Sequence, residues 1–441
     1  MSSSELEYLY SIRSVRDTNQ CTDGLIEENR LTNFDVDSSK FDSVVDFVIS
    51  TIESSYETKE SLLTIPIHGR YQHFEGNGKP RLTNLINDQL KGETDLEICK
   101  KLVDLFMVSV LLDAGAGNEW KYTEDDGTVV SRSEGLAVAS FHMFSNGDFS
   151  DSKKDKYQVN GSKLANFSEE EMKKGFQVTS SNPIAGFEGR YQMIRHLGQT
   201  LVENKEVFGE DARPGNMVDY LIANKAKGRQ LDLEDLWMCL IKSLQPIWPT
   251  EGRIKVSGET IGDVWFLQNR IDYSKKKFGK DDVPEWSKVV TFHKLVQWLT
   301  YSLFLPLIKY GHFEILNANY MTGLPEYRNG GLFVDLGLLT LKPDQLARGL
   351  EFSKKVGFNP EIPTFTPEDD VIVEWRSCII CLLDRLLPLV NGKMGISGTK
   401  YEMSLPQLIE AGSWSSGRAI AKKLRSNGGP PIELFADGTV F

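Results

Sequence analysis

Cysteine is scarce in this chain, and so are apolar runs long enough to cross a membrane. Five cysteines provide no disulfide framework, which is typical of a reducing compartment. Cys378 and Cys381 form the one close pair, and the Ile and Leu residues around them predict a buried helix, not a redox or zinc site. The longest uncharged apolar stretch, residues 295–308, is too short to span a bilayer, and the N-terminus has no apolar signal-peptide core. We therefore expect a soluble, cytoplasmic protein without a membrane partner.

Positive charge is also in short supply. The 441 residues include 50 Lys and Arg against 62 Asp and Glu, which gives a formal net charge of -12. Because an acidic chain is a poor match for phosphate backbones, nucleic acid is not an expected partner. An anionic small substrate would need a local cluster of Arg, Lys or His.

The common signatures of catalysis are missing. The sequence has no GxxxxGK[ST] loop, no GxGxxG turn after a strand, no HExxH, no GxSxG and no EF-hand loop. These absences argue against nucleotide hydrolases, Rossmann dehydrogenases, zinc peptidases and serine hydrolases. No group of residues has the spacing of metal ligands, so we expect neither a metal nor a cofactor.

Apolar residues at helical spacing dominate what is present, and they predict a mainly α fold with minor β elements. Thr94 with Glu97, and Ser168 with Glu171, have the spacing of capping boxes and mark two helix starts. The predicted helices cover residues 39–56, 94–114, 134–144, 168–176, 189–208, 231–244, 287–310, 342–355, 367–390 and 405–425.

Strands are expected to be few. Residues 62–74 and 432–435 have patterns that predict short strands. No break in composition separates two domains within the helical part. We therefore expect a polar N-terminal extension, residues 1–38, followed by a single large, mostly helical catalytic domain, residues 39–441.

Asp335 is the most unusual residue, because it is a lone carboxylate inside the apolar run GGLFVDLGLL, residues 330–339. A buried carboxylate must be hydrogen-bonded, paired or protonated. One interpretation is a general base or a carboxylate that stabilises a cation. The other is a cap that precedes a turn at Gly337 and binds backbone N–H groups, and the run alone does not separate the two.

Other polar residues lie near the predicted ends of elements. Asp113 ends a predicted helix close to Trp120 and Tyr122, which suits either a small polar ligand or a helix end that faces solvent. His68 and Arg70 would share one face of a predicted strand, where they bind an anion or form an ordinary polar face.

Charged motifs mark further boundaries, where sites usually form. They are Arg132-Ser133-Glu134, Glu188-Gly189-Arg190, Gly262-Asp263 and Glu326-Tyr327-Arg328. None of them is specific by itself.

Glu374 and Arg376 open a predicted apolar helix. Neighbours on a helix surface are three or four residues apart, so a spacing of two makes these side chains point in different directions.

Many segments together resemble the fungal and bacterial uracil-catabolism family, long described as a domain of unknown function and as a uracil-regulated protein. Leu305 departs from the pattern, because many relatives have an acidic residue there, and any role of that acid is lost. The matching segments, in order, are IPIHGRYQHFE (65–75), VSVLLDAGAGNEWKY (108–122), RSEGLAVASFHMF (132–144), FQVTSSNPIAGFEGR (176–190), IGDVW (261–265), FHKLVQWLTYSLFLP (292–306), EYRNGGLFVDLGLL (326–339), VEWRSCIICLLDRL (373–386) and DGTVF (437–441).

A more distant resemblance concerns the queuosine-nucleotide N-glycosylase family of queuosine salvage. Residues 326–339 look like its Arg-containing segment, which runs into an apolar, strand-like stretch and an aspartate. Glu374-Trp375-Arg376 is similar to its acidic-Ile-Arg pattern, and residues 112–120 to its Asn-Phe-Trp-type segment. This resemblance implies an all-helical, DNA-glycosylase-like domain.

The two resemblances together imply a reaction. The uracil-catabolic route yields urea through a ribosylurea-type intermediate, and the second family breaks an N-ribosyl bond. The expected activity is hydrolysis of the N-glycosidic bond of ribosylurea, or of its 5-phosphate, so the expected partner is a small ribosyl substrate. The alternatives are another step, such as ring opening or deamidation, or a non-catalytic partner of the pathway enzymes.

Such a reaction passes through an oxocarbenium-like state, which a nearby carboxylate stabilises. Asp335 is the expected carboxylate. Candidates for assisting the departure of urea are Asp113, Glu134 and Glu326. Candidates for binding a phosphate are His68, Arg70, Arg190 and Arg328. Candidates for walling the ribose are Trp120, Tyr122 and Tyr327.

Overall fold

The computed structural model describes residues 1–117 and 119–435, which form two compact units. The first unit contains Met1–His68, Thr250–Lys294 and Asn319–Phe435, and the second contains Gly69–Pro249 and Leu295–Ala318. Residues 1–38, which were predicted to form a polar N-terminal extension, belong to the first unit. The DGTVF motif at 437–441 lies outside the described residues.

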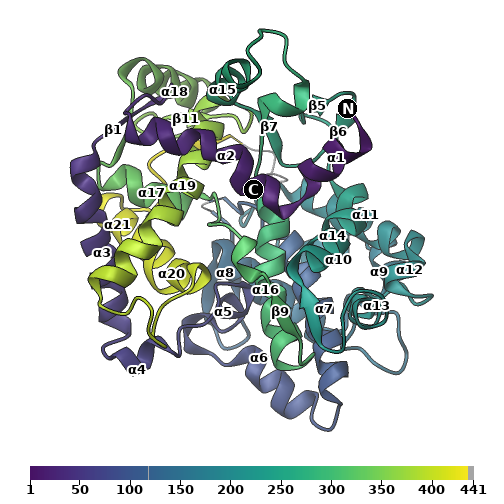
Figure 1. The fold of residues 1–441 in the computed structure, drawn as a ribbon. Coiled ribbons are helices and arrows are strands. Elements are labelled where there is room, and N and C mark those ends of the chain that lie inside the picture. Colours follow the sequence, from purple (N-terminus) through teal and green to yellow (C-terminus); the bar gives the residue numbers. More distant parts are fainter. Residues whose placement is uncertain (118, 436–441) are drawn as a thin grey trace. The chain divides into compact units, whose positions relative to one another are not determined.

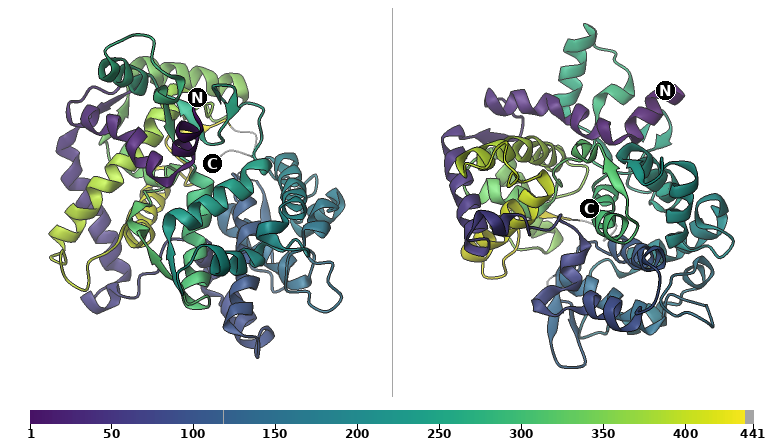
Figure 2. Two further views of the ribbon diagram at one scale, coloured as in Figure 1. Left: turned by 45° about the vertical axis from the view of Figure 1, so that its right-hand side comes forward. Right: turned by 60° about the horizontal axis from the view of Figure 1, so that its bottom comes forward.

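Both units are mainly helical, which confirms the predicted fold class (Figures 1 and 2). Each sheet formed by the described residues has only two strands. None of the helices in this part of the chain combines the length and apolar character needed to cross a membrane.

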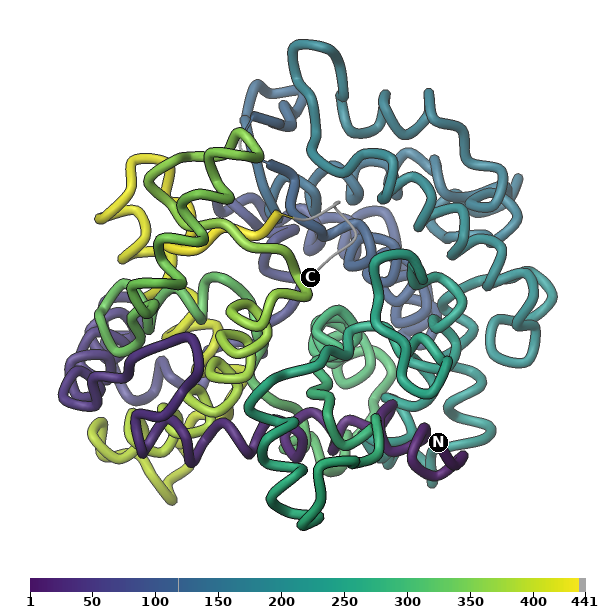
Figure 3. The backbone as a smooth tube through the Cα atoms, turned by 90° about the horizontal axis from the view of Figure 1, so that it is seen from above, coloured from purple at the N-terminus to yellow at the C-terminus, as the bar shows by residue number. Residues whose placement is uncertain are grey.

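The first unit joins segments that are far apart in the sequence. Figure 3 shows the purple N-terminal segment beside the yellow-green C-terminal part, where helix α2 packs on helix α19. Its helices are α1 (Ser3–Tyr10), α2 (Ile12–Glu27), α3 (Phe41–Ser55), α4 (Lys59–Leu62), α15 (Gln268–Phe278), α17 (Tyr327–Asp335), α18 (Pro343–Val356), α19 (Asp370–Lys393), α20 (Leu405–Leu408) and α21 (Trp414–Leu424).

Short strands tie these helices together. β1 (Phe34–Val36) pairs antiparallel with β10 (Leu339–Leu341), and its register sets Phe34 opposite Leu341. The other pairs of the first unit are β5 (Lys255–Val256) with β6 (Glu259–Thr260), β7 (Val264–Phe266) with β8 (Val289–Thr291), and β11 (Thr364–Phe365) with β12 (Glu433–Leu434). The strand predicted at 432–435 is thereby confirmed.

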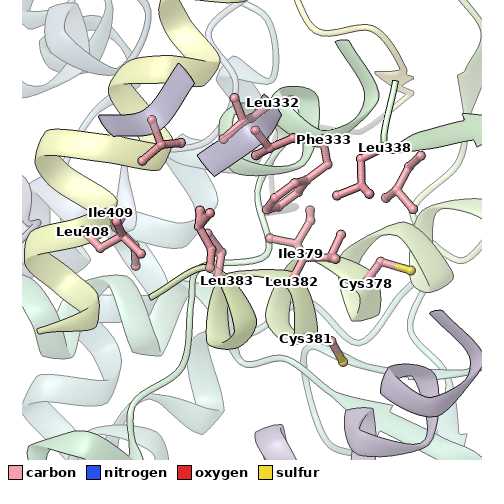
Figure 4. Packing of buried hydrophobic residues seen from close by; sticks show 14 of the residues in the cluster. Leu332, Phe333, Leu338, Cys378, Ile379, Cys381, Leu382, Leu383, Leu408 and Ile409 are labelled. Atoms are coloured by element: carbon pink, nitrogen blue, oxygen red, sulfur yellow. The ribbon is translucent and has the colours of Figure 1, made fainter. Parts of the chain in front are cut away.

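Helix α17 packs into the first unit's core through Leu332 and Phe333. Figure 4 shows Leu332 and Phe333 of α17 facing Ile379 and Leu382 of α19, all of them buried. Cys378 and Cys381 are buried in the same cluster, as predicted.

The stretch before Asp335, which resembles a strand-like stretch of the queuosine-nucleotide N-glycosylase family, forms helix α17 in this chain. Gly330 and Gly331 lower the helix propensity of this segment, so its sequence does not predict a helix. Gly330 is needed for close packing, because a Cβ there would lie 2.5 Å from the Ile379 side chain, and Gly417 of α21 is needed because a Cβ there would collide with the Arg328 carbonyl. Tertiary packing therefore decides the conformation of this segment.

The second unit is built around α7 (Asp95–Leu111), which is buried from Ile98 onward except at Lys100. Its strand pairs are β2 (Lys121–Thr123) with β3 (Val129–Ser131), and β4 (Gln230–Asp232) with β9 (Glu314–Leu316). Its other helices are α5 (Arg70–Phe74), α6 (Arg81–Asn84), α8 (Arg132–Asn146), α9 (Gly161–Ala165), α10 (Glu169–Gly175), α11 (Phe187–Glu203), α12 (Lys205–Phe208), α13 (Met217–Asn224), α14 (Leu233–Leu244) and α16 (Lys294–Lys309).

The predicted N-caps are present. The Thr94 hydroxyl accepts the Glu97 N–H and starts α7, and Ser168 with Glu171 forms a complete capping box before α10. Both caps are local, so the sequence alone was sufficient to place these two helix starts.

The strands predicted for residues 62–74 are wrong. Leu62 is the last residue of α4, residues 70–74 form α5, and Arg70, His73 and Phe74 are all buried on one helical face. These three residues have the i, i+3, i+4 spacing of a helix face. Two of them are polar, so a pattern based on apolar residues did not reveal the helix.

The helix predicted from residue 287 starts later than expected. Residues Val289–Thr291 form β8 instead, and α16 begins at Lys294. The β-branched residues Val289, Val290 and Thr291 favour a strand, and β7 is there to pair with it.

Candidate functional site

The candidate residues divide between the two units. Those in the second unit are Arg70, Asp113, Trp120, Tyr122, Glu134 and Arg190, and those in the first unit are His68, Glu326, Tyr327, Arg328 and Asp335. Each set is described by itself.

Asp113 is the centre of a polar cluster in the second unit. It follows the last turn of α7, and its side chain keeps 10% of its exposure. Its carboxylate accepts hydrogen bonds from Arg70 Nη1 at 2.8 Å, from Ser133 Oγ at 2.7 and 2.9 Å, and from Trp298 Nε1 at 3.1 Å. Three side chains from α5, α8 and α16 thus fix the orientation of one carboxylate.

Arg70 is completely buried and binds several acceptors at once. Its Nε donates to Ser109 Oγ at 2.9 Å and its Nη2 to the Ser109 carbonyl at 3.1 Å. Burial lowers the pKa of Arg70, and the charge of Asp113 opposes that shift. The ion pair compensates a guanidinium that would otherwise be buried alone.

Ser133 reaches Asp113 because the chain turns sharply before it. Arg132, between β3 and the body of α8, has a φ of 55°, in the left-handed region that residues with a side chain rarely adopt. Ser133 Oγ lies within hydrogen-bonding distance of Arg70 Nη1 and His73 Nδ1, at 3.1 Å from each, as well as of Asp113. Strain of this kind is concentrated at functional sites.

His73 and Trp298 complete the cluster. The centroids of their rings are 5.6 Å apart, and Arg70 Nη1 lies 3.2 Å from His73 Nδ1. Neither residue was predicted as part of a site from the sequence, although both lie in segments that carry the family resemblance. Only the tertiary structure brings them next to Asp113.

Arg190 supports the loop that carries Asp113. Its guanidinium donates to the carbonyls of Leu112 at 3.1 Å, Ala114 at 2.6 Å and Gly115 at 2.7 Å, and also to that of Ala185. Burial lowers the pKa of Arg190 to about 10, and Asp113 acts in the opposite direction. A cation at these carbonyls suits the C-terminal end of α7.

Trp120 and Tyr122, which were predicted to contact the ribose, contact residues outside the Asp113 cluster. Trp120 is fully buried, and its Nε1 donates to the Phe176 carbonyl at 2.8 Å. Tyr122 in β2 stacks on His142 with ring centroids 5.8 Å apart, and burial raises the pKa of Tyr122 to about 12.

Glu134 is different, because it adjoins Ser133 in the first turn of α8 and is only half-buried. It is therefore the predicted acid that lies nearest in sequence to the Asp113 cluster.

Asp335 has a partner that the sequence did not reveal. At the end of α17, its two oxygens accept from Arg425 Nη1 at 2.8 Å and Nη2 at 2.5 Å, and the side chain is only 3% exposed. The charge in the apolar run is thus neutralised by an ion pair from α21's C-terminal cap.

The remaining candidates of the first unit serve local structure. Glu326 caps α17 by accepting the N–H groups of Arg328 and Asn329, each at 2.7 Å, and burial raises the pKa of Glu326. Arg328 is buried and donates to the Gly428 carbonyl at 2.7 Å, whereas Tyr327 is 40% exposed. His68 Nδ1 lies 2.6 Å from Glu410 Oε2.

A second buried ion pair in the first unit joins two motifs from the sequence. Asp263 accepts from both terminal nitrogens of Arg376 at 2.8 Å, from Trp265 Nε1 at 2.7 Å and from the Lys294 N–H at 2.9 Å. Arg376 also lies 4.1 Å from the centroid of the Phe292 ring.

Glu374 points in a different direction from Arg376, as their spacing of two residues predicted. It accepts the N–H groups of Thr32 and Asn33, both at 2.7 Å. Across residues 1–117 and 119–435, His, Cys, Asp and Glu form no group of three or more that could hold a metal ion.

Comparison with known proteins agrees with the resemblance to the uracil-catabolism family. The chain is 47% identical to Uracil catabolism protein 4 of Lachancea kluyveri, over 99% of each chain, and 42% identical to Protein urg3 of Schizosaccharomyces pombe, over the whole of both. The model of the family described as "Protein of unknown function (DUF1688)" matches residues 8–441. The chain therefore belongs to the DUF1688 family.

Proposed function

We propose that this protein acts in uracil catabolism, where it hydrolyses the N-ribosyl bond of ribosylurea to give urea and ribose. The pathway is supported by the similarity to a relative named Uracil catabolism protein 4. The reaction is supported by the resemblance to an N-glycosylase family and by a carboxylate site that suits the chemistry.

Cleavage of an N-ribosyl bond builds positive charge at the anomeric carbon. A fixed carboxylate beside that carbon stabilises the charge without reorganising in the transition state. Asp113 meets this requirement, since Arg70, Ser133 and Trp298 hold its carboxylate in place. This fixed and partly exposed carboxylate is the observation that carries the proposal.

Asp335 is the second candidate for the same role. Its exposure of 3%, against 10% for Asp113, and its paired contact with Arg425 leave it less accessible to a substrate. The geometry therefore favours Asp113.

Departing urea needs a proton or a strong hydrogen bond. In the second unit Glu134 is the candidate, because it is an acid in the first turn of α8 that is only half-buried. In the first unit Glu326 is the candidate, because burial raises the pKa of its carboxyl.

The cations of the second unit bear on whether the substrate is phosphorylated. Arg70 and Arg190 direct most of their N–H groups to protein oxygens, so they serve the Asp113 site more than an external phosphate. This favours ribosylurea over its 5-phosphate.

Purified protein incubated separately with ribosylurea and with its 5-phosphate tests the proposal. We expect urea and free sugar in equal amounts, with the higher kcat/KM for ribosylurea. Release of ammonia without urea would instead indicate deamidation. The absence of turnover on both compounds would favour a different step, such as ring opening, or a non-catalytic partner of the pathway enzymes.

A further inference from the structure

Arg270 is a buried arginine to which the protein supplies no anion. It lies in the first turn of α15, in the first unit, and only 8% of its surface is exposed. Its Nε is buried without an acceptor. Within residues 1–117 and 119–435, no oxygen accepts a hydrogen bond from its guanidinium and no carboxylate pairs with it. A buried charge in this state is costly and points to a ligand or ion that completes the site.

The other buried arginines show that this fold can satisfy a guanidinium. In the part of the chain that the structure describes, every other buried arginine donates to a carboxylate or to a backbone carbonyl. They are Arg70, Arg81, Arg190, Arg213, Arg328 and Arg376. Arg270 is the exception, so its acceptor must come from outside the chain.

The groups nearest to Arg270 do not compensate its charge. Burial and the charge of Asp17 raise the pKa of Tyr8 to about 12, and the charge of Arg270 acts against this shift. Burial likewise raises the pKa of Cys21, and Arg270 again opposes it. The phenol and the thiol therefore lie near the guanidinium and are neutral at neutral pH, while Asp17 forms no ion pair with it.

The helix itself gives no reason for an arginine at this position. The N-terminal end of a helix is positive, and α15 has no acidic residue in its first turn. The lysines of its last turn, Lys275, Lys276 and Lys277, face the negative end and are favoured there. Local structure thus accounts for these lysines but not for Arg270.

The guanidinium lies beside a ring at the surface. Arg270 Cζ is 5.5 Å from the centroid of the Tyr273 ring, and Tyr273 is 43% exposed. Lys277, which is also exposed, has its Nζ 5.9 Å from the same centroid. Two cations at one ring favour a doubly charged anion such as phosphate over a carboxylate.

We propose that Arg270, Lys277 and Tyr273 form a phosphate-binding site on α15. The guanidinium binds two phosphate oxygens through parallel N–H groups, and Lys277 adds a second positive charge. The exposed Tyr273 ring offers a contact for the organic part of a small phosphate monoester. The ligand is thus inorganic phosphate or such an ester. This site is separate from the Asp113 cluster and does not depend on the proposed function.

Two substitutions of buried arginines separate a ligand site from a structural role. Arg270→Met keeps most of the side-chain volume and removes a charge that no protein group accepts, so its unfolding midpoint in chloride should equal or exceed that of the unmodified protein. Arg376→Met breaks the ion pair with Asp263 and should lower the midpoint. We expect Arg376→Met to retain the response to phosphate and Arg270→Met to lose it.

The test is denaturant unfolding of the full-length proteins at equal ionic strength in chloride, inorganic phosphate, ribose 5-phosphate, or chloride with ribose. A ligand that binds the folded state raises the midpoint, whereas the general stabilisation by phosphate salts is common to all variants. We expect apparent phosphate affinity to weaken about tenfold or more in Arg270→Met, the size of a hydrogen bond to a charged group. A stronger response to ribose 5-phosphate than to phosphate, with none to ribose, would identify an ester as the ligand.

Two results would overturn the proposal. One is an equal response to phosphate in Arg270→Met and the unmodified protein, since the site would then not involve Arg270. The other is an Arg270→Met variant that is destabilised in chloride as strongly as Arg376→Met, since Arg270 would then have its partner within the protein.

Discussion

Replacing Asp113 by Asn removes the negative charge of the cluster and changes little else in size. The loss of one preorganised electrostatic contact to a transition state costs about 3 kcal/mol, so we expect kcat for urea release to fall by about a hundredfold or more. The fold should suffer as well. The new amide nitrogen must face Arg70, Ser133 or Trp298, which all donate to the carboxylate in the native protein.

A matched control separates catalysis from stability. Asp104 lies on the same helix α7, is fully buried, and accepts from Arg213 Nε and from the Gly215 N–H, both at 2.6 Å. Its burial raises the pKa of Asp104 to about 6, so it is mostly ionised in a neutral assay. Asp104→Asn therefore also breaks a buried ion pair, and each variant should lose about 3 kcal/mol of unfolding free energy.

The assay measures initial rates of urea release at saturating ribosylurea, with the folded fraction of each variant taken from denaturant unfolding. We expect Asp104→Asn to keep its kcat per folded molecule and Asp113→Asn to lose it. An Asp113→Asn variant whose kcat stays within about threefold of the unmodified protein would exclude this role for Asp113, since that corresponds to less than about 1 kcal/mol of transition-state stabilisation.

Two further predictions concern the first unit. Burial raises the pKa of Glu374 from 4.5 to about 7, so the unfolded chain loses this proton at a lower pH than the folded protein does, and stability falls as pH rises between these values. Over this pH range the unfolding free energy of the unmodified protein should fall by about 3 kcal/mol more than that of Glu374→Gln. Denaturant unfolding at several pH values measures this difference, and an equal change of unfolding free energy with pH in both proteins would contradict the prediction. Asp335→Asn breaks the pair with Arg425, so we expect unfolding free energy to fall by about 1–3 kcal/mol while kcat falls less than in Asp113→Asn. A larger loss of kcat in Asp335→Asn than in Asp113→Asn would move the catalytic role to Asp335.

The sequence predicted those parts of the fold that depend on neighbouring residues. The caps at Thr94 and Ser168 and the buried helix around Cys378 follow from local spacing. The short α5 was predicted as a strand and α17 was not predicted as a helix, because buried polar residues and glycines packed against a neighbouring helix weaken the local pattern.

The site was predicted residue by residue but not as an assembly. Asp113, Arg70 and Arg190 were each selected, yet the charge beside Asp335 comes from a residue 90 positions away, and Trp298 reaches Asp113 across 185 positions. Long-range pairs of this kind depend on how helices pack, which a single sequence does not specify. Ser133 was noted only as the middle of a charged motif, and the left-handed turn at Arg132 that presents it is invisible in composition.

Hydrolysis of ribosylurea in ¹⁸O-labelled water tests the central claim most directly. Cleavage of the N-ribosyl bond adds water at the anomeric carbon and leaves the urea carbonyl untouched, so we predict that the released urea contains no label, whereas ribose is labelled both by the reaction and by exchange of its anomeric oxygen with the water. Label recovered in carbon dioxide or in a carbamoyl product, with the ribosyl bond intact, would contradict the account, because water would then have attacked the urea carbonyl.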